Sequence, residues 1–89
     1  MVVPDEFDEV VLTDHVRRDK PVGNDRVKNV VKQVGGPVYK DKKKQGYHLL
    51  DGATSIVFVS EGDSKAVVVT AYPNFQRDYN HSSRFSRIK

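Results

Sequence analysis

The chain has 89 residues, the size of a single domain, and its 37% hydrophobic and 30% charged residues are typical of a globular protein. It has no cysteine, which excludes disulfides, thiolate metal sites, cysteine-ligated iron–sulfur clusters and thiol catalysis. No apolar run approaches the roughly 20 residues of a membrane span, and residues 1–12 carry four acidic and no basic side chains, unlike a signal peptide. We therefore expect a soluble, cytoplasmic protein without membrane contact.

The net charge of +3 is unevenly distributed. Residues 1–14 hold five acids and no base, residues 15–48 hold ten bases and three acids, and residues 73–89 hold four bases and one acid. Basic side chains gathered in this way are typical of a protein that presents one face to a polyanion. An ordinary solvated surface shows similar clusters, so composition alone leaves both interpretations open.

A short helix is predicted from residue 14 to residue 18, after a strand or turn at residues 10–12. Thr13 or Asp14 can cap this helix, because either side chain can accept a hydrogen bond from an amide two or three residues ahead. Pro21 and Gly23 end it.

A second helix is predicted to follow, with Asn24 or Asp25 as its cap and Gly35-Gly36-Pro37 as its end. Four valines recur at helical spacing and form one apolar stripe: Val27, Val30, Val31 and Val34. Valine is a middling helix former, so this helix needs a surface to pack its stripe against.

From residue 38 onward the pattern is that of β-strands. Strands are predicted at residues 38–41, 47–50, 55–60 and 66–72, with turns at 42–46, 51–52 and 61–64. The last two strands lack polar–apolar alternation, so we expect them to be central and covered on at least one face by the valine stripe. Residues 74–89 show no periodicity and are expected to form a mobile tail, docked at most through Phe75 or Tyr79.

The expected fold is therefore α+β, with two N-terminal helices packed on a three- or four-stranded antiparallel sheet of unresolved strand order. Residues 1–73 form the single domain, and residues 74–89 form a basic, flexible tail.

Four groups of side chains are candidates for chemistry. The first lies on and just after the first helix: His15, Arg17, Arg18 and Lys20. Histidine exchanges a proton near neutral pH, and guanidinium groups bind phosphate through a planar fork. The alternative is a histidine that only caps or packs at the start of a helix.

The second group interleaves bases with aromatic rings across a hairpin: Tyr39, Lys40, Lys42, Lys43, Lys44, Tyr47 and His48. Ammonium groups bind phosphates, and rings stack on unpaired bases, as in grooves for single-stranded nucleic acid. A lysine-rich strand edge that discourages aggregation has the same composition.

The third group is Thr70 and Tyr72, two hydroxyl residues in a strand that is otherwise apolar. Simple alternation towards solvent would also explain Thr70. The fourth group, Arg77, His81, Arg84 and Arg87, lies in the expected tail, where it would add non-specific affinity for a polyanion.

The sequence contains no glycine-rich phosphate loop, nucleophile elbow or metal-binding spacing, so we expect neither a metal nor a cofactor. Histidine, arginine, lysine, tyrosine and threonine are suited to RNA cleavage by the RNA's own 2′-hydroxyl. That reaction needs a general base, cations around the phosphorane and an acid for the leaving 5′ oxygen.

The stretch Leu-Thr-Asp-His-Val-Arg-Arg at residues 12–18, the valine helix, the Tyr/Lys hairpin and Val-Val-Val-Thr-Ala-Tyr at residues 67–72 follow one another in a familiar order. Residues 12–72 resemble the small phage and toxin domains of the barnase/EndoU/colicin/RelE-like ribonuclease group. The resemblance implies helices before a curved antiparallel sheet, with a histidine and an arginine on the early helix and a Thr or Ser, then Tyr, on the final strand.

By this resemblance His15 is the helix histidine, Arg18 or Arg17 the phosphate-binding arginine, and Thr70 the hydroxyl of the last strand, with Tyr72 beside it. Pro21 shortens the helix relative to the family, which leaves the choice of arginine open. His48 has no counterpart in the family, and it becomes the second acid/base residue if it faces the same groove.

The expected function is that of a metal-independent endoribonuclease or toxin-like domain acting on RNA, with a cognate inhibitor as a further partner. Two alternatives remain open. One is a non-catalytic phage-type module that binds and inhibits a host protein, and the other is a plain RNA-binding module that uses the lysine hairpin.

Overall fold

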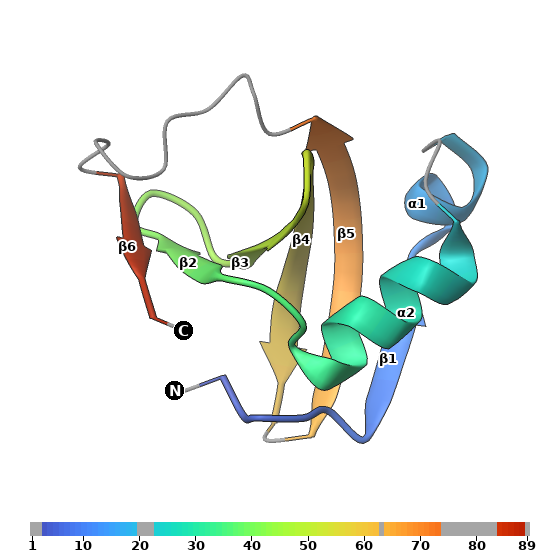
Figure 1. Cartoon of the computed structure of the whole chain (residues 1–89), viewed down its shortest axis with the longest axis horizontal. Helices are drawn as coiled ribbons and strands as arrows, with labels where there is room; N and C mark the ends of the chain where they lie inside the picture. The colour runs from blue at the N-terminus through green and yellow to red at the C-terminus, as the bar shows by residue number, and fades with distance from the viewer. Residues whose placement is uncertain (1–2, 20–22, 63, 74–83, 89) are drawn as a thin grey trace.

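The computed structural model describes residues 3–19, 23–62, 64–73 and 84–88. These residues form two short helices and a six-stranded sheet (Figure 1). In chain order the elements are β1 (Glu9–Leu12), α1 (Asp14–Asp19), α2 (Asn24–Gln33), β2 (Val38–Asp41), β3 (Tyr47–Asp51), β4 (Thr54–Glu61), β5 (Lys65–Pro73) and β6 (Phe85–Arg87). The α+β class with two N-terminal helices is confirmed.

The sheet has the strand order β1-β5-β4-β3-β2-β6. All neighbouring strands are antiparallel except β1, which runs parallel to β5. The expectation of three or four strands, all antiparallel, was therefore wrong. The predicted placement of the two apolar strands is confirmed, because β4 and β5 lie inside the sheet.

Both additional strands extend the edges of the predicted sheet. The N-terminal strand joins because Leu12 and the buried Phe7 just before it fill the core beside β5. At the other edge β6 lies in the expected tail, where the sequence analysis predicted no regular structure. It pairs with β2, and the backbone amide of Ile88 donates to the carbonyl of Val38 at 2.9 Å.

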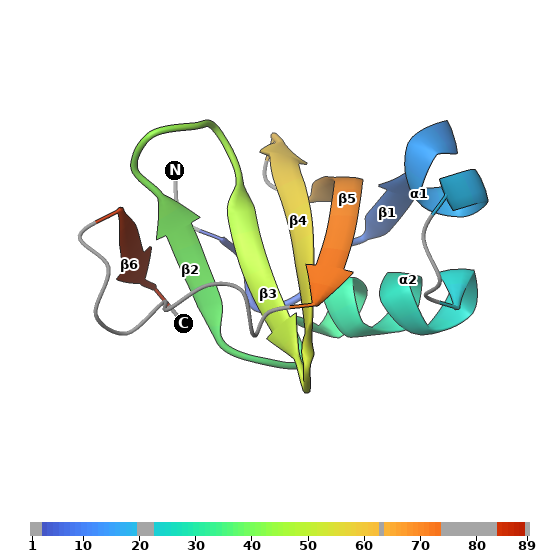
Figure 2. The ribbon, with the colours of Figure 1, turned by 90° about the horizontal axis from the view of Figure 1, so that it is seen from above.

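Helix α2 lies on one face of the sheet (Figure 2). Its valine stripe packs against the core there, as predicted. Val27 and Val31 are buried, and Val30 and Val34 pack partly buried against the same core. The side chain of Val16 on α1 is buried in the same core. Burial of these side chains, rather than helix propensity, stabilises the two helices.

The ends of α2 differ in detail from the expected caps. Gly23, rather than Asn24 or Asp25, precedes the first turn, and it supplies no side-chain hydrogen bond. At the other end Val34, not a glycine, takes the left-handed conformation with φ 49°. Gly36 is needed for another reason: a Cβ atom there would overlap the carbonyl oxygen of Leu50 on β3.

Neither α1 nor α2 has the length and hydropathy of a membrane-crossing helix, and this finding covers only the residues that the structure describes.

The close approach at Gly36 gives a stability prediction. Gly36→Ala should lower the free energy of unfolding by about 2–3 kcal/mol, because either the backbone that follows α2 or strand β3 must move to make room for the methyl group. Gly35→Ala is the matched control, since its Cβ would meet nothing closer than 3.7 Å. Urea unfolding of the three proteins measures both effects, and equal unfolding midpoints would show that the chain does not pass this close to β3.

Candidate functional site

The candidate site lies on the face of the sheet away from α2, which we call the far face. Strand alternation places it there: Val38, Tyr47 and Leu49 point into the core beneath α2, so their neighbours on β2 and β3 point the other way. The far-face side chains that form the site are Tyr39, Asp41, His48, Thr70, Tyr72, Phe85 and Arg87.

A bulge in β5 brings Thr70 and Tyr72 to this face. Phe58 of β4 pairs with Val68, whereas the preceding Val57 pairs with Thr70, so Val69 is an extra residue in β5. If Val69 were a regular strand residue, Thr70 and Tyr72 would continue the alternation of the buried Val68 and point into the core. The bulge therefore re-aims both hydroxyl side chains, a common use of bulges beside functional sites.

A short polar contact of the far face joins two predicted site residues. The Oη atom of Tyr72 lies 2.9 Å from Nδ1 of His48. The other ring nitrogen of His48, Nε2, lies 3.7 Å from a carboxylate oxygen of Asp41. In the tautomer that carries its proton on Nε2, that proton faces this negative charge and Nδ1 accepts a hydrogen bond from the Tyr72 hydroxyl.

The His48 ring is held in place by packing. It meets the Phe85 ring edge-on, with 4.9 Å between centroids, and only 5% of the residue is exposed. Tyr39 and Phe85 form a small second cluster with Leu50 on this face. Tyr72 is half-buried, so it connects the covered imidazole with the surface.

Asp41 organises the polar part of the site. It accepts two hydrogen bonds of 2.9 Å from the guanidinium of Arg84, and backbone N–H groups of Lys43 and Lys44 donate to it at 2.9 and 3.3 Å. The hydrogen bonds from Arg84 hold the pKa of the Asp41 carboxyl well below its ordinary value, outweighing burial, which acts in the opposite direction. Asp41 is thus a carboxylate at neutral pH.

The structure brings only part of the predicted catalytic set together. His48 and Tyr72 are in contact, and Thr70 lies in the same cross-strand row as His48, with Val57 between them. His15 instead lies on α1, beside β5 and at the sheet edge opposite β6 (Figures 1 and 2). Strands β5 and β4 separate α1 from β3, and β3 and β5 alone are about 10 Å apart.

The other described members of the first candidate group lie with His15 on α1, away from the far face. His15, Arg17 and Arg18 are exposed, and Nε of Arg17 donates to the carbonyl of Leu12 at 3.1 Å. Lys20 lies outside the described residues, as do Phe75, Arg77, Tyr79 and His81.

The hairpin lysines do not share one surface. Lys42, Lys43 and Lys44 are exposed in the loop between β2 and β3, available to a polyanion. Lys40 points to the α2 side, where its ammonium lies 4.7 Å from the centroid of the Tyr47 ring. Both Tyr39 and Tyr47 are buried, so neither ring offers the free stacking face that the sequence analysis expected.

Two residues of the site were missed by sequence reasoning: Asp41 was counted only among the charges, and Phe85 was assigned to the tail. Arg84, which binds Asp41, was named only as a tail cation with non-specific affinity for a polyanion. The one sequence signal for Asp41 is its place as a lone acid among four lysines. No periodicity marks Arg84 or Phe85, because β6 is only three residues long.

Within the described residues, no three His, Asp or Glu side chains gather as ligands for a metal ion. Comparisons with protein-family models, with curated proteins and with solved structures find no match to this chain. The function must therefore be argued from the site itself.

The Asp41–Arg84 pair predicts a pH dependence of stability. Because folding lowers the pKa of Asp41, its contribution is fully present above the ordinary value of about 4 and is lost as the pH falls through the folded-state value. Asp41→Asn should lower the unfolding free energy at pH 7 by about 2 kcal/mol, since it leaves Arg84 without its carboxylate.

Urea unfolding between pH 7 and pH 2 should show the gap between wild type and Asp41→Asn shrinking below about pH 4. Asp51→Asn is the matched control, because Asp51 pairs with the exposed Arg26 and such pairs contribute little. A gap that stays constant with pH would mean that the Asp41 carboxylate does not stabilise the fold through its charge.

Proposed function

We propose that this protein is a metal-independent endoribonuclease whose acid/base group is the His48–Tyr72 pair. The observation that carries the proposal is the 2.9 Å contact between Tyr72 Oη and His48 Nδ1, with Asp41 on the other side of the imidazole. A carboxylate, an imidazole and a hydroxyl in series are suited to move a proton in steps, because each group stabilises the charge that develops on the next.

The reaction that fits this series is attack of an RNA 2′-hydroxyl on the adjacent phosphorus. Tyr72, at the surface end, accepts the 2′ proton while its own phenolic proton passes to Nδ1 of His48. The bond from the 2′ oxygen to phosphorus forms and the bond to the 5′ oxygen breaks, with water giving a proton to the 5′ oxygen. The products are a 2′,3′-cyclic phosphate and a 5′-hydroxyl end.

The phosphorane formed on the way carries extra negative charge and needs hydrogen-bond donors and cations nearby. Arg87 lies in the same cross-strand row as Tyr39 and His48, and Thr70 lies at the other end of this row. Both project from the far face, on either side of the histidine. Thr70, two residues from Tyr72 on the same strand and face, is the group we assign to the phosphate oxygens. Arg87 lies four strand spacings away from Thr70, roughly 19 Å, and adds positive charge to the far face.

The proposal places the acid/base role on His48 rather than on His15. The ribonuclease resemblance favoured His15, but that residue lies on α1 outside β5, whereas His48 contacts a hydroxyl and faces a carboxylate. Catalytic groups must converge on one phosphate, and the far face offers that convergence.

The test is RNA cleavage in chelator-containing buffer. Tyr72→Phe removes only the hydroxyl, so it should reduce the cleavage rate by about 100-fold with little change in the unfolding midpoint. Tyr39→Phe is the matched control: it removes a hydroxyl from the same face at a residue to which the proposed reaction gives no step, and it should change the rate by less than about 2-fold. The readout is the formation of 2′,3′-cyclic phosphate ends on a labelled single strand.

Two outcomes would contradict the proposal. If Tyr72→Phe cleaves as fast as wild type, the hydroxyl does not take part in proton transfer. If His15→Ala abolishes cleavage while Tyr72→Phe does not, the acid/base role belongs to α1, as the resemblance implies.

RNA binding without cleavage is the second candidate, favoured by the covered His48 ring and the exposed lysine loop at residues 42–44. In that case no cyclic phosphate forms, and affinity for a single strand falls steeply with salt, because lysines release counterions from the phosphates.

A further inference from the structure

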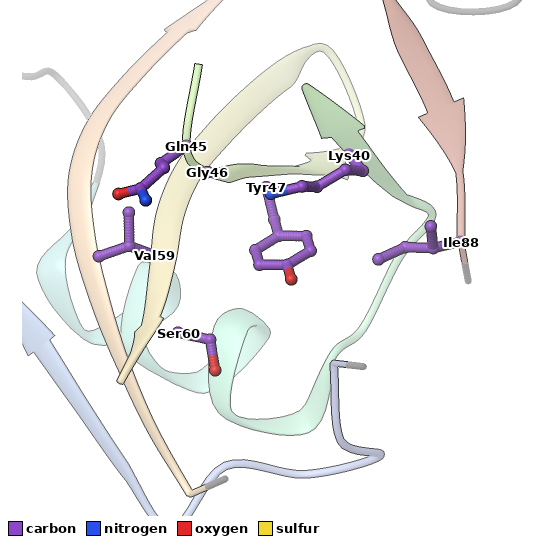
Figure 3. A pocket seen from close by; sticks show the side chains of 7 residues that line it. All are labelled: Lys40, Gln45, Gly46, Tyr47, Val59, Ser60 and Ile88. Carbon is purple, nitrogen blue, oxygen red and sulfur yellow. The ribbon is translucent and has the colours of Figure 1, made fainter. Parts of the chain in front are cut away.

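A pocket opens at the end of the sheet where β4 extends beyond the first residue of β3. The pairing of these two strands stops at Tyr47 and Phe58, while β4 runs on to Glu61 and the chain before Tyr47 forms the lysine loop. The resulting notch has a volume of about 390 Å³ (Figure 3). Its lining residues are Lys40, Gln45, Gly46, Tyr47, Val59, Ser60 and Ile88.

Part of the lining is apolar and held rigidly. The Tyr47 ring stacks on Phe58 at 5.5 Å between centroids, so its position is fixed by the core. Ile88 is 41% exposed, and no other large apolar side chain among the described residues is exposed. Figure 3 shows Ile88 directed towards the Tyr47 ring across the pocket. An apolar or planar group placed in the pocket would cover the exposed Ile88 side chain and the small part of the buried Tyr47 ring that lines the pocket.

The pocket also carries a positive charge without a carboxylate partner. Lys40 forms no ion pair with any described residue, and its ammonium lies over the Tyr47 ring at 4.7 Å. The neighbouring acid on β4, Glu61, lies 3.6 Å from Lys65. The three lysines of the 42–44 loop extend the positive charge beyond the pocket. An anionic group is therefore the ligand that this charge favours.

Hydrogen-bonding groups complete the lining. Ser60 donates its hydroxyl proton to the carbonyl of Gly62 at 3.1 Å, so its oxygen remains an acceptor. Gln45 offers an amide with two donors and an acceptor. The volume lies near the lower end of the ~300–1,000 Å³ typical of small-ligand sites, which suits one nucleotide.

We infer that this pocket binds one unpaired nucleotide, with its base against the exposed Ile88 side chain and its phosphate at Lys40. As a subsite for the RNA substrate the inference rests on the proposed function, and it names that substrate as single-stranded. Tyr47 and His48 are consecutive on β3, so the pocket and the far-face site lie on opposite faces of one hairpin. A strand that reaches both must pass the loop of Lys42, Lys43 and Lys44, which only a flexible single strand can follow.

The test is titration of the full-length ¹⁵N-labelled protein, followed by amide chemical shifts. Uridine and adenosine 5′-monophosphate should produce saturable shifts at Gly46, Ser60 and Ile88, whereas inorganic phosphate and a free nucleoside should bind at least 10-fold more weakly. A single-stranded tetraribonucleotide should perturb the same amides more tightly than the monophosphates, and a blunt RNA duplex should not perturb them.

Variants separate the pocket from general charge. Lys40→Met keeps the aliphatic stem and should weaken monophosphate binding by about 10-fold or more, while Lys28→Met, on the exposed face of α2, should change it less than 2-fold. Ile88→Ala, at an exposed position, should weaken binding several-fold.

Binding that phosphate alone reproduces, or that Lys28→Met weakens as much as Lys40→Met, would overturn the inference by reducing it to a charge effect. Tighter binding of free monophosphate than of the tetranucleotide would overturn the RNA subsite in favour of a small-nucleotide site. Saturable RNA binding without cleavage would refute the proposed nuclease and leave the pocket standing, and cleavage without shifts at Gly46 would refute the pocket alone.

Discussion

The carboxylate of Asp41 is the constraint on which the far face depends. It accepts both guanidinium hydrogen bonds of Arg84 and the amides of Lys43 and Lys44, and it faces His48. This one buried charge thus holds Arg84, the residue before β6, and the first residues of the lysine loop. It also sets the electrostatic environment of the His48 imidazole. Such a charge is stable in a covered site only because its partners compensate for the lost hydration.

The second feature that determines the site is which residues of β5 face the core and which face away from it. Strand alternation alone would bury Thr70 and Tyr72 beneath α2, and the extra residue at Val69 turns them to the side of His48. The same local change lets Ala71 complete the core in their place. Fold and site are coupled here, since the irregular pairing at Val69 decides which face carries the hydroxyl groups of this sequence.

The parts of the structure that the sequence predicts are those that depend on residues close together in the chain. The valine helix and the β2–β5 strands depend on local periodicity and turn residues such as Gly52, and these predictions were confirmed. The pairing of β1 and β6 depends on partners far along the chain, and a three-residue strand has no period to detect. For the site, His48 and Tyr72 were named in advance, but their contact required the bulge at Val69, which no pattern marks.

The central claim is that Tyr72 gives its proton to His48, and the tautomer of the imidazole tests it most directly. In long-range ¹H–¹⁵N spectra of the full-length protein at neutral pH, the account predicts a His48 proton on Nε2 and an Nδ1 shift that responds to Tyr72→Phe. A proton on Nδ1 would contradict the account, because the imidazole would then donate to Tyr72 and could not accept the phenolic proton.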